Sequence, residues 1–323
     1  MRALVTGGAG FIGSHLAHRL VADGHDVRVL DNFSTGSRSN LAELEDAVDL
    51  VEGDIQSYER AHNAVQGCEV VFHQAALPSV PRSIQDPLTS TAVNVIGTLN
   101  LLLAARDSGV RRVVYASSSS IYGADQTLPK REERAPMPIS PYAVAKLASE
   151  GYCRSFSAVY GLETVALRYF NVFGPRQDPL SQYAAVIPQF ITALLAGAAP
   201  VVYGDGEQSR DFTYIDNVVE ANLLAAKADG ISGQTFNVAC GERISINSLL
   251  DALREITCTD VQAEYLECRP GDVKHSLADI TQAEERLGYR PSIGFSDGLR
   301  RTVAHLRGRA DAGAAVIGPQ SSS

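Results

Sequence analysis

A tyrosine and a lysine stand four residues apart in the segment SPYAVAK, positions 140–146. The serine and proline that open this segment favour a helix start, so Tyr142 and Lys146 would share one helix face. An ammonium held ~4–5 Å from a phenolate stabilises it by up to ~3–4 kcal/mol at an effective dielectric of ~20, which lowers the phenol pKa. We expect Tyr142, assisted by Lys146, to act as a general base on a hydroxyl group. The alternative is an ordinary surface pair, since this spacing is common by chance.

Four consecutive serines, Ser117 to Ser120, stand at the end of a predicted buried strand, Arg112–Ser117. A hydroxyl at a strand end can hydrogen-bond a reacting oxygen, and we expect Ser118 to do so. The other serines of the run are either further contacts or ordinary loop residues.

A glycine-rich run, GGAGFIG at positions 7–13, follows the first predicted strand and opens a helix. Missing Cβ atoms let backbone N–H groups approach a pyrophosphate, and the helix N-terminus adds a favourable dipole. Asp31 ends the second predicted strand, about ~20 residues further on, where a carboxylate binds ribose hydroxyls and repels a 2′-phosphate. The pattern therefore predicts NAD rather than NADP, with a plain strand-to-helix turn as the alternative. The residues expected to bind the cofactor are Gly7, Gly10, Phe11, Ile12, Gly13, Asp31, Asn32, Asp54, Ile55, Gln74, Ala75, Ala76, Tyr142 and Lys146.

Short apolar runs alternate with helical stretches through the first half of the chain. This rhythm predicts an α/β fold with a doubly wound parallel Rossmann sheet and helices on both of its faces. The predicted strands are Arg2–Thr6, Asp26–Leu30, Val48–Glu52, Val70–Gln74, Arg112–Ser117 and Thr164–Tyr169. The predicted helices are Gly13–Asp23, Gln56–Val65, Val93–Ser108 and Pro141–Tyr160.

The regular alternation ends near residue 171, and a second, smaller α/β substrate-binding domain is expected beyond it. Predicted elements of this later part are helices at Pro188–Ala196 and Ile246–Thr257, a strand at Gln234–Val238 and a Gly-Asp-Gly turn within Val201–Arg210. We assign residues 1–171 and 212–258 to the NAD-binding domain and residues 172–211 and 259–308 to the second domain, with a cleft between them. Residues 309–323 show no packing pattern and are expected to be a disordered tail.

The composition is that of an ordinary folded protein, with 45% hydrophobic and 20% charged residues. A net charge of −9 disfavours nucleic acid or an anionic membrane as the main partner. We expect a cytoplasmic protein, because no apolar run approaches ~18 residues and the first strand begins too early for a signal peptide. The five cysteines contain no CxxC pair and the histidines no ligand-spaced pair, so neither disulfides nor a metal site is expected.

Together, the GxxGxxG turn, the strand-end serine and the YxxxK helix resemble the extended short-chain dehydrogenase/reductase family, from Met1 to about Leu306. The resemblance implies hydride transfer between NAD and a sugar carbon. Nucleotide-sugar 4,6-dehydratases carry Asp-Glu where this chain has Ser119-Ser120, and UDP-glucuronate decarboxylases carry Glu at the position of Ser120. Without those acids, oxidation and re-reduction of one carbon remain, which is epimerisation through a 4-keto intermediate.

Motifs of the second lobe resemble the UDP-galactose and UDP-N-acetylglucosamine 4-epimerases: LRYFNVFGPR at 167–176, AVIP at 185–188, GDGEQSRDF at 204–212 and RPGD at 269–272. The resemblance implies that Asn171, Arg210 and Arg269 bind the pyrophosphate of a UDP-sugar, although each arginine alone could form only a surface ion pair. It also implies that Asp272 binds a ribose hydroxyl, while 185–187 and 202–203 enclose the uracil. The residues expected to bind substrate are Arg82, Ser117, Ser118, Ser119, Asn171, Ala185, Val186, Val202, Tyr203, Arg210, Arg269, Asp272 and Ser276.

Ser276 occupies a position that acts as a gate beside the sugar in the 4-epimerases that this chain resembles. A bulky tyrosine there confines an enzyme to glucose and galactose, whereas a small residue admits an N-acetyl group. The expected substrates are therefore UDP-GlcNAc and UDP-GalNAc. A small residue would also admit UDP-glucuronate, whose carboxylate Arg82, Ser117 or Ser119 could bind and Asp178 would oppose; UDP-glucose is the third alternative.

A reading from another class is an NAD-binding protein without catalysis. The presence of Tyr142, Lys146 and Ser118 together disfavours it. The resemblance further implies a homodimer formed through the predicted helices 93–108 and 141–160.

Overall fold

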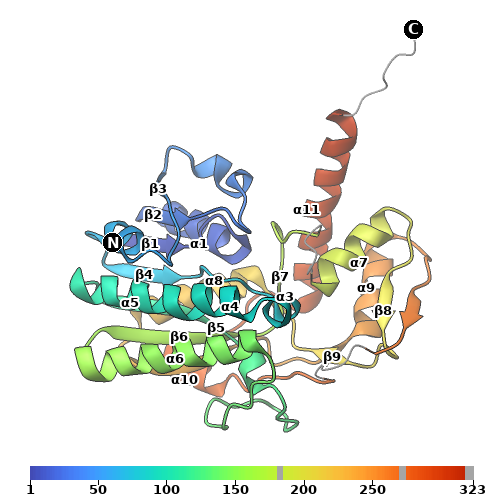
Figure 1. Cartoon of the computed structure of the whole chain (residues 1–323). Coiled ribbons are helices and arrows are strands. Elements are labelled where there is room, and N and C mark those ends of the chain that lie inside the picture. Colours follow the sequence, from blue (N-terminus) through green and yellow to red (C-terminus); the bar gives the residue numbers. More distant parts are fainter. Residues whose placement is uncertain (180–184, 269–273, 317–323) are drawn as a thin grey trace.

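The computed structural model describes residues 1–179, 185–268 and 274–316, with side chains described as far as Gly308. Its centre is a seven-stranded sheet in the order β11-β6-β5-β4-β1-β2-β3, in which every neighbouring pair is parallel (Figure 1). The strands are β1 (Arg2–Thr6), β2 (Asp26–Asp31), β3 (Val48–Glu52), β4 (Val70–His73), β5 (Arg112–Ser118), β6 (Glu163–Tyr169) and β11 (Gln234–Val238). The predicted doubly wound parallel sheet is confirmed.

Helices cover both faces of this sheet. On one face α2, α5 and α6 pack side by side, and α5 and α6 cross the front of the first lobe in Figure 1. On the other face lie α1, α8 and α10. The helical elements that surround the sheet are α1 (Phe11–Ala22), η1 (Arg38–Leu44), α2 (Tyr58–Val65), α3 (Val80–Gln85), α4 (Pro87–Thr91), η2 (Ala92–Gly97), α5 (Thr98–Asp107), η3 (Ser119–Tyr122), α6 (Pro141–Tyr160), α8 (Ile215–Lys227) and α10 (Thr281–Leu287).

The middle residues of the central strands are mostly apolar because both faces of the sheet are covered. Alternate residues of β1 enter separate cores: Leu4 packs with helices of one face, and Ala3 and Val5 pack with those of the other. The strand pairing places Thr6 beside both Leu30 and His73. The carboxyl ends of the strands therefore meet at one edge of the sheet, where ligands bind in open α/β folds.

The second lobe is built from three helices that pack on one another, α7 (Val186–Leu195), α9 (Ile246–Thr257) and α11 (Phe295–Val316). Short strand pairs complete it: β8 (Val201–Tyr203) is parallel to β13 (Glu264–Leu266), and β9 (Ser209–Arg210) is antiparallel to β12 (Ile244–Ser245). A further parallel pair joins β7 (Val172–Phe173) to β10 (Thr213–Tyr214). In the sequence, β7 stands between β6 of the sheet and α7 of the second lobe, and β10 stands between β9 of the second lobe and α8.

Two elements lie in a different lobe from the one that the domain assignment predicts. Helix α9 falls within 212–258, yet it packs on α7 and α11 because its buried leucines, Leu249, Leu250 and Leu253, face the second lobe. Helix α10 falls within 259–308, yet it packs on β11 and α8 of the sheet. The two lobes therefore exchange more segments than the sequence predicts.

The end of the chain also differs from the expectation of a disordered tail. Helix α11 continues to Val316, past residue 309. The segment ADAGAAV at 310–316 is rich in alanine, the strongest helix former, which explains the extension. The rest of the predicted tail, 317–323, lies outside the described residues.

The stretch Pro87–Asp107, which joins α4, η2 and α5, is 21 residues long and apolar enough to cross a membrane by length and composition. The expectation that the chain has no such stretch was therefore wrong. Part of the stretch is buried against α6 and α2, and core helices of soluble proteins meet the same criterion.

Candidate active site

The glycine-rich turn joins β1 to α1 in a conformation that favours glycine, and a Cβ atom on Gly7 would lie 2.7 Å from the backbone of Ala75. Gly7 has φ +66°, and its N–H donates to the carbonyl oxygen of Leu30 over 2.8 Å. A Cβ atom on Gly13 would lie 2.1 Å from the carbonyl oxygen of Gly7, so no other residue fits there. This close packing opens the N-terminus of α1 towards the cleft, as an anion site requires.

Asp31 is buried at the end of β2, directly beside this turn. Its carboxylate accepts hydrogen bonds from Ala9 N (2.9 Å) and Phe33 N (2.8 Å), which fix its orientation. Burial raises the pKa of this carboxyl, and the backbone hydrogen bonds act against that rise. Next to it, Asn32 donates to Asp54 over 2.8 Å and so links the ends of β2 and β3.

A cavity of about 690 Å³ runs along the carboxyl edge of the sheet. It is large enough for a dinucleotide to lie in it as an extended chain. Every residue predicted to bind the cofactor lines this cavity, as do Arg82 and Ser117 of the predicted substrate set. The lining residues that the sequence analysis missed include Leu30, Ser34, Thr35, Gly36, Gly53, Leu77, Pro78, Ser79, Val93, Ala116, Tyr169 and Gln177.

The predicted catalytic pair lies at one end of this cavity. Helix α6 begins where expected, with the Ser140 side chain accepting from Ala143 N and proline in the first turn. Tyr142 and Lys146 both line the cavity from this helix. The Lys146 ammonium lies 5.9 Å from the Tyr142 ring centre and donates to the carbonyl oxygen of Ala116 over 2.8 Å.

The expected lowering of the Tyr142 pKa is not found in this arrangement. Burial raises the pKa of Tyr142 to about 12, and a hydrogen bond with Ser118 only partly opposes this. Burial also lowers the pKa of Lys146 to about 8. The prediction counted the attraction between the two groups, to which the charge of bound NAD+ was expected to add, and it omitted the desolvation of both side chains. A phenolate at this position needs further positive charge nearby.

The serine run divides into hydroxyls with different surroundings. The Ser117 hydroxyl donates to the buried carboxylate of Glu150, so it is already engaged inside the protein. Ser118 contacts the Tyr142 hydroxyl and also accepts from Ser120 N over 3.2 Å. Neither Ser118 nor Ser119 is among the residues that line the two cavities described for this chain.

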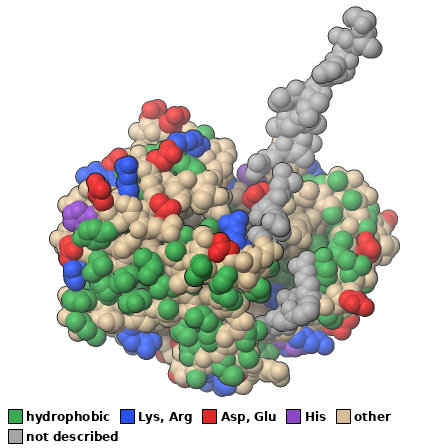
Figure 2. All heavy atoms as spheres, viewed as in Figure 1, with side chains coloured by type: hydrophobic (Ala, Val, Ile, Leu, Met, Phe, Trp, Pro, Cys, Tyr) green, Lys and Arg blue, Asp and Glu red, His purple; other side chains and the backbone are tan. Residues whose placement is uncertain are grey.

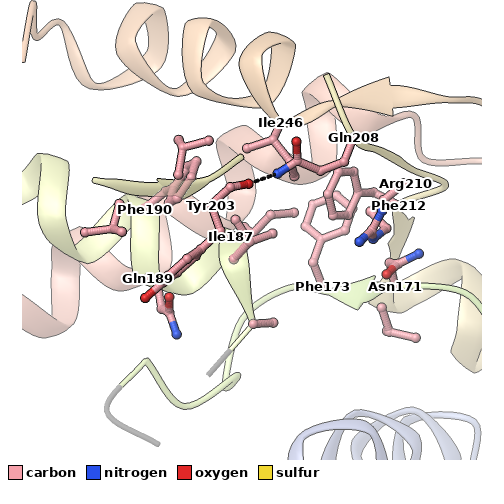
Figure 3. Close-up of a pocket in the computed structure, with 15 residues that line it drawn as sticks. Asn171, Phe173, Ile187, Gln189, Phe190, Tyr203, Gln208, Arg210, Phe212 and Ile246 are labelled. Carbon is pink, nitrogen blue, oxygen red and sulfur yellow. Dashed lines mark hydrogen bonds between the residues drawn. The ribbon is translucent and has the colours of Figure 1, made fainter. Parts of the chain in front are cut away.

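A second cavity, of about 270 Å³, opens in the second lobe (Figure 3). Phe190, Ile187 and Ile246 give it apolar walls, while Gln208 donates to the carbonyl oxygen of Tyr203 over 2.6 Å. The two cavities share Val172 and Ala185, so they adjoin. Predicted substrate residues that line the second cavity are Asn171, Ala185, Val186, Val202, Tyr203 and Arg210.

Asn171 and Arg210 lie together at one side of this second cavity (Figure 3). The Arg210 guanidinium donates to the carbonyl oxygens of Ser209 (2.9 Å) and Lys274 (3.2 Å). Asn171 donates to the carbonyl oxygen of Asp211 over 3.2 Å. Backbone carbonyls thus help to orient both side chains.

Three further predicted substrate residues are not placed at either cavity. Arg269 and Asp272 lie outside the described residues. Ser276 is described. Its N–H donates to the carbonyl oxygen of Ser209, the residue before Arg210, over 3.0 Å. Its segment therefore runs beside β9, but Ser276 itself lines neither cavity.

Several residues of the second cavity were missed by the sequence analysis. They are Gln189, Phe190, Val201, Gln208, Phe212 and Ile246. Phe212 and Gln208 stand inside the motif GDGEQSRDF, which was a usable signal. Ile246 comes from the first turn of α9, which the domain assignment had placed in the other lobe.

Comparisons with known proteins agree with this geometry. Residues 3–239 match the NAD dependent epimerase/dehydratase family. The UDP-glucose 4-epimerase of Mycolicibacterium smegmatis is 41% identical over 313 residues, which cover 96% of this chain and 99% of that protein. The structure of UDP-N-acetylglucosamine 4-epimerase from Methanobrevibacter ruminantium, in complex with UDP-N-acetylmuramic acid, is 41% identical with a TM-score of 0.92, covering 95% of this chain and 98% of that one. The UDP-glucuronic acid 4-epimerase from Bacillus cereus, in complex with UDP-glucuronic acid and NAD, is 31% identical with a TM-score of 0.88, covering 96% and 100%.

The chain belongs to the NAD-dependent epimerase/dehydratase family. It is an isomerase, an epimerase that uses NAD as its cofactor. The residues of the long cavity fit this cofactor, because a helix N-terminus with a glycine turn lies beside a carboxylate at the end of β2.

Proposed function

We propose that this chain is a UDP-sugar 4-epimerase whose preferred substrates are UDP-GlcNAc and UDP-GalNAc. The observation that carries this proposal is the junction of the two cavities at Val172 and Ala185. A nucleoside in the smaller cavity would direct its pyrophosphate and sugar into the larger one. The sugar would then lie beside Tyr142, where the cofactor cavity ends.

The smaller cavity suits a uridine. Its apolar walls, which include Phe190 and Val202, would enclose the flat base, and polar groups at the rim would bind the base edge. The backbone of the segment that begins α7 is well placed for this role, since Ala185 stands at the N-cap without a side-chain cap. Its first N–H groups are therefore available to carbonyl oxygens of a ligand.

The pyrophosphate would be bound by Arg210 and Asn171 at the side of the cavity that adjoins the sugar. A guanidinium is suited to this dianion because it donates two parallel hydrogen bonds. Both side chains already have backbone partners that orient them. The sequence motif at 269–272 suggests that Arg269 and Asp272 complete this site.

In the reaction that we propose, Tyr142 removes the proton from the C4 hydroxyl, and Ser118 orients that oxygen. NAD, when bound, supplies the hydride acceptor and a positive charge that favours the phenolate. Lys146 holds its ammonium beside both the phenol and the cofactor cavity. Because burial, only partly opposed by the Ser118 hydrogen bond, raises the pKa of Tyr142 to about 12, we expect the phenol to stay protonated until this added charge is present.

Inversion at C4 requires the 4-keto sugar to present its opposite face. We infer that the sugar turns about its pyrophosphate while Arg210 and Asn171 retain the nucleotide. Tyr142 then returns the proton as the hydride is restored. No net redox change occurs, so the cofactor is expected to stay bound through many turnovers.

The preference for N-acetylhexosamines rests on the small residue at position 276. Its backbone is held beside β9, next to Arg210. We expect this segment to lie near the sugar. A serine leaves room for an acetamido group where a tyrosine would not. The relative named as a UDP-N-acetylglucosamine 4-epimerase, at 41% identity, supports the same choice.

UDP-glucuronate is the second candidate substrate, favoured by one observation. Arg82 lines the large cavity from α3, which packs on the helix α6 that carries Tyr142, and a guanidinium would pair with a C6 carboxylate. Asp178 lines the same cavity and would oppose that negative charge. This opposition is our reason for ranking the acid second.

Turnover of three substrates by the purified protein tests the proposal. UDP-GlcNAc, UDP-glucuronate and UDP-glucose are supplied separately, and the epimeric products are resolved by chromatography. The highest kcat/KM is expected for UDP-GlcNAc. A product from UDP-glucuronate alone would replace our choice with the second candidate, and no turnover of any of the three would refute the proposed activity.

We further infer that the enzyme is a homodimer formed through the face made by α4, η2, α5 and α6, which includes the predicted helices 93–108 and 141–160. Apolar side chains gather over this face of the first lobe (Figure 2). The more exposed among them are Leu88 (83%), Ile96 (48%), Val144 (52%) and Val159 (68%). A contiguous apolar patch of this kind is characteristic of a subunit contact. Light scattering of the purified protein tests this, and the mass of a single chain would refute it.

A further inference from the structure

A buried ion pair lies directly beneath the catalytic end of β5. Glu150 of α6 and Arg168 of β6 are 2–3% exposed, and two guanidinium nitrogens donate to the carboxylate over 2.8 and 2.9 Å. The same carboxylate accepts the hydroxyl of Ser117. Because Ser117 immediately precedes Ser118, this triad fixes the backbone of the strand end that carries the predicted substrate-orienting hydroxyl.

The polar contacts continue away from the catalytic end through Tyr122, which is fully buried. The remaining Arg168 nitrogen donates to the Tyr122 hydroxyl over 2.9 Å. That hydroxyl in turn donates to the side-chain oxygen of Asn237 over 2.7 Å. The chain of contacts Ser117–Glu150–Arg168–Tyr122–Asn237 therefore crosses the carboxyl edge of three neighbouring strands, β5, β6 and β11.

Asn237 joins this chain to the segment that follows Ser276. Its amide nitrogen donates to the carbonyl oxygens of Lys130 (2.9 Å) and Asp279 (3.0 Å). Lys130 also accepts from Asp279 N and donates from its own N–H to Leu277 O. Asn237 thus holds the backbone of 277–279, the segment that leads from Ser276 into α10.

A second contact ties the same segment to the expected pyrophosphate site. Ala278 N donates to the buried carboxylate of Asp211 over 3.1 Å. Asp211 directly follows Arg210, and its carbonyl oxygen accepts from Asn171. The far end of the polar chain is therefore in contact with the residues that would hold the substrate.

We propose that this buried polar chain couples the two halves of the active site, with Tyr122 and Glu150 as positioning residues. One end sets the direction of Ser118 and so the hydrogen bond to Tyr142. The other end fixes the position of the 276–279 backbone relative to the expected sugar site. The inference rests on the proposed function, since it assigns a purpose to groups that never touch substrate.

The chemistry of the chain suits this role better than simple adhesion between strands. An apolar core of the same shape is often as stable as a buried ion pair, so such pairs are weak stabilisers. A fully bonded polar network instead permits only one relative arrangement of its members. Tyr122 provides the direct side-chain link, because its hydroxyl joins Arg168 to Asn237. A parallel link runs through Glu132, whose backbone oxygen accepts from Arg168 over 3.5 Å and whose carboxylate accepts from Asn237 N over 2.7 Å.

Tyr122→Phe tests the coupling because it removes that hydroxyl and keeps the ring. The matched control is Tyr289→Phe, which also removes one fully buried hydroxyl, bonded only to the carbonyl oxygen of Ala239 at 2.9 Å. Each variant is assayed for kcat and KM with UDP-GlcNAc, for bound NAD, and for thermal stability. We expect similar losses of stability and unchanged NAD in both.

The kinetic constants should separate the two variants. Tyr122→Phe is expected to lower kcat by about tenfold and to raise KM by a few fold, because small misplacements of reacting groups are costly. Tyr289→Phe should keep both constants within about twofold of wild type. Equal kinetic constants in the two variants would overturn the coupling and leave Tyr122 a purely structural residue.

Ser117→Ala cuts the chain at its catalytic end and serves if Tyr122→Phe fails to fold. It is expected to lower kcat with KM unchanged, since the sugar-side contacts remain. In the double variant Ser117→Ala/Tyr122→Phe the loss of kcat should not exceed that of Tyr122→Phe alone. If the two residues acted independently, the fold-losses of kcat of the two single variants would multiply. If the wild-type protein turns over none of the three UDP-sugars, the proposed function fails. If the wild-type protein is active and the two variants have equal kinetic constants, only the coupling proposal fails.

Discussion

The two halves of the cleft are built on different principles. The cofactor half is formed where parallel strands end side by side, so a glycine turn, a carboxylate and a helix N-terminus converge through one regular sheet. The substrate half is assembled from strand pairs of two or three residues and from helices that are distant in sequence. Regular pairing fixes the cofactor site rigidly, whereas the substrate site depends on individual side-chain and backbone contacts. Single substitutions in the cofactor half should therefore cause large losses of activity or of bound NAD, whereas single substitutions in the substrate half should cause smaller losses.

The largest effect is expected at the point where the halves meet. Tyr142→Phe removes the phenol and keeps the ring that lines the cavity. Loss of a general acid–base group lowers kcat by about 10²–10⁴-fold, and we expect the upper part of that range. Bound NAD should be unchanged, as measured from the absorbance and the extracted nucleotide of the purified protein.

Tyr58→Phe is the control for this substitution. The Tyr58 hydroxyl donates to Asp107 at the surface, and Tyr58 is not among the residues that line the large cavity. It should keep full activity. Wild-type rates in Tyr142→Phe would contradict the role of the phenol, and loss of NAD would show that the ring supports the cofactor instead.

The glycine turn offers the next largest effect, confined to the cofactor half. Gly13→Ala places a Cβ 2.1 Å from the Gly7 carbonyl oxygen, so the turn must open. We expect NAD retention to weaken by about 100-fold, or about 2.7 kcal/mol, measured as NAD per chain after dialysis.

Gly151→Ala is the matched control, because Gly151 also lies inside a helix and a Cβ there meets nothing within 4 Å. It should leave NAD unchanged and stabilise α6 by up to about 1 kcal/mol, since glycine is unfavourable within helices. Equal NAD retention in both variants would show that the turn tolerates a side chain and that its shape is not what binds the pyrophosphate.

A buried histidine in the cofactor half also predicts a dependence of stability on pH. His73 is buried at the end of β4, between the hydroxyls of Thr6 (2.7 Å) and Thr98 (2.9 Å). Burial, with the nearby charge of Lys146, lowers the pKa of His73 to about 3. The unfolded chain has a histidine pKa of about 6.5, so the folded state is stabilised fully above that pH and loses stability as the pH falls towards 3.

At pH ~5 this single group should lower the free energy of unfolding by about 2 kcal/mol relative to pH ~7.5. Urea denaturation at the two pH values measures the difference. His73→Gln removes the titrating ring, so its own difference should be smaller by about the same amount. Equal differences in the variant and the wild type would show that His73 does not titrate as its burial requires.

The contrast between the halves also explains what the sequence could predict. The cofactor site follows from a contiguous strand–turn–helix and from strand ends that the parallel sheet must align, so the residues predicted between Gly7 and Lys146 all line one cavity. The pKa of Tyr142 could not be predicted in the same way. Its direction depends on how far burial removes water from the phenol, which spacing along a helix does not reveal.

In the substrate half, the sequence identified only residues that lie within motifs resembling those of known 4-epimerases. Arg210 and Asn171 were found through motifs, whereas Gln208 and Ile246 reach the cavity through pairing of β9 with β12 and through the packing of α9. Ser117 was assigned to substrate, yet its hydroxyl is bonded to Glu150. A sequence pattern identifies a strand end but not which way each hydroxyl points.

The smallest effect is expected in the substrate half, where several groups share one ligand. Arg210→Lys keeps the positive charge and removes the paired donors of the guanidinium, as well as its hydrogen bonds to Ser209 O and Lys274 O. We expect KM for UDP-GlcNAc to rise by about tenfold, equivalent to about 1.4 kcal/mol, with kcat within about threefold of wild type.

Arg300→Lys is the control, because Arg300 is exposed on α11 of the same lobe. Its KM should be unchanged. The informative quantity is the ratio of the effect on KM to the effect on kcat in Arg210→Lys. A fall in kcat with unchanged KM would mean that Arg210 acts on the reacting sugar rather than on the nucleotide. In that case the substrate half would contribute to the reaction step as well as to nucleotide binding. The expectation that single substitutions there have only small effects would then be wrong.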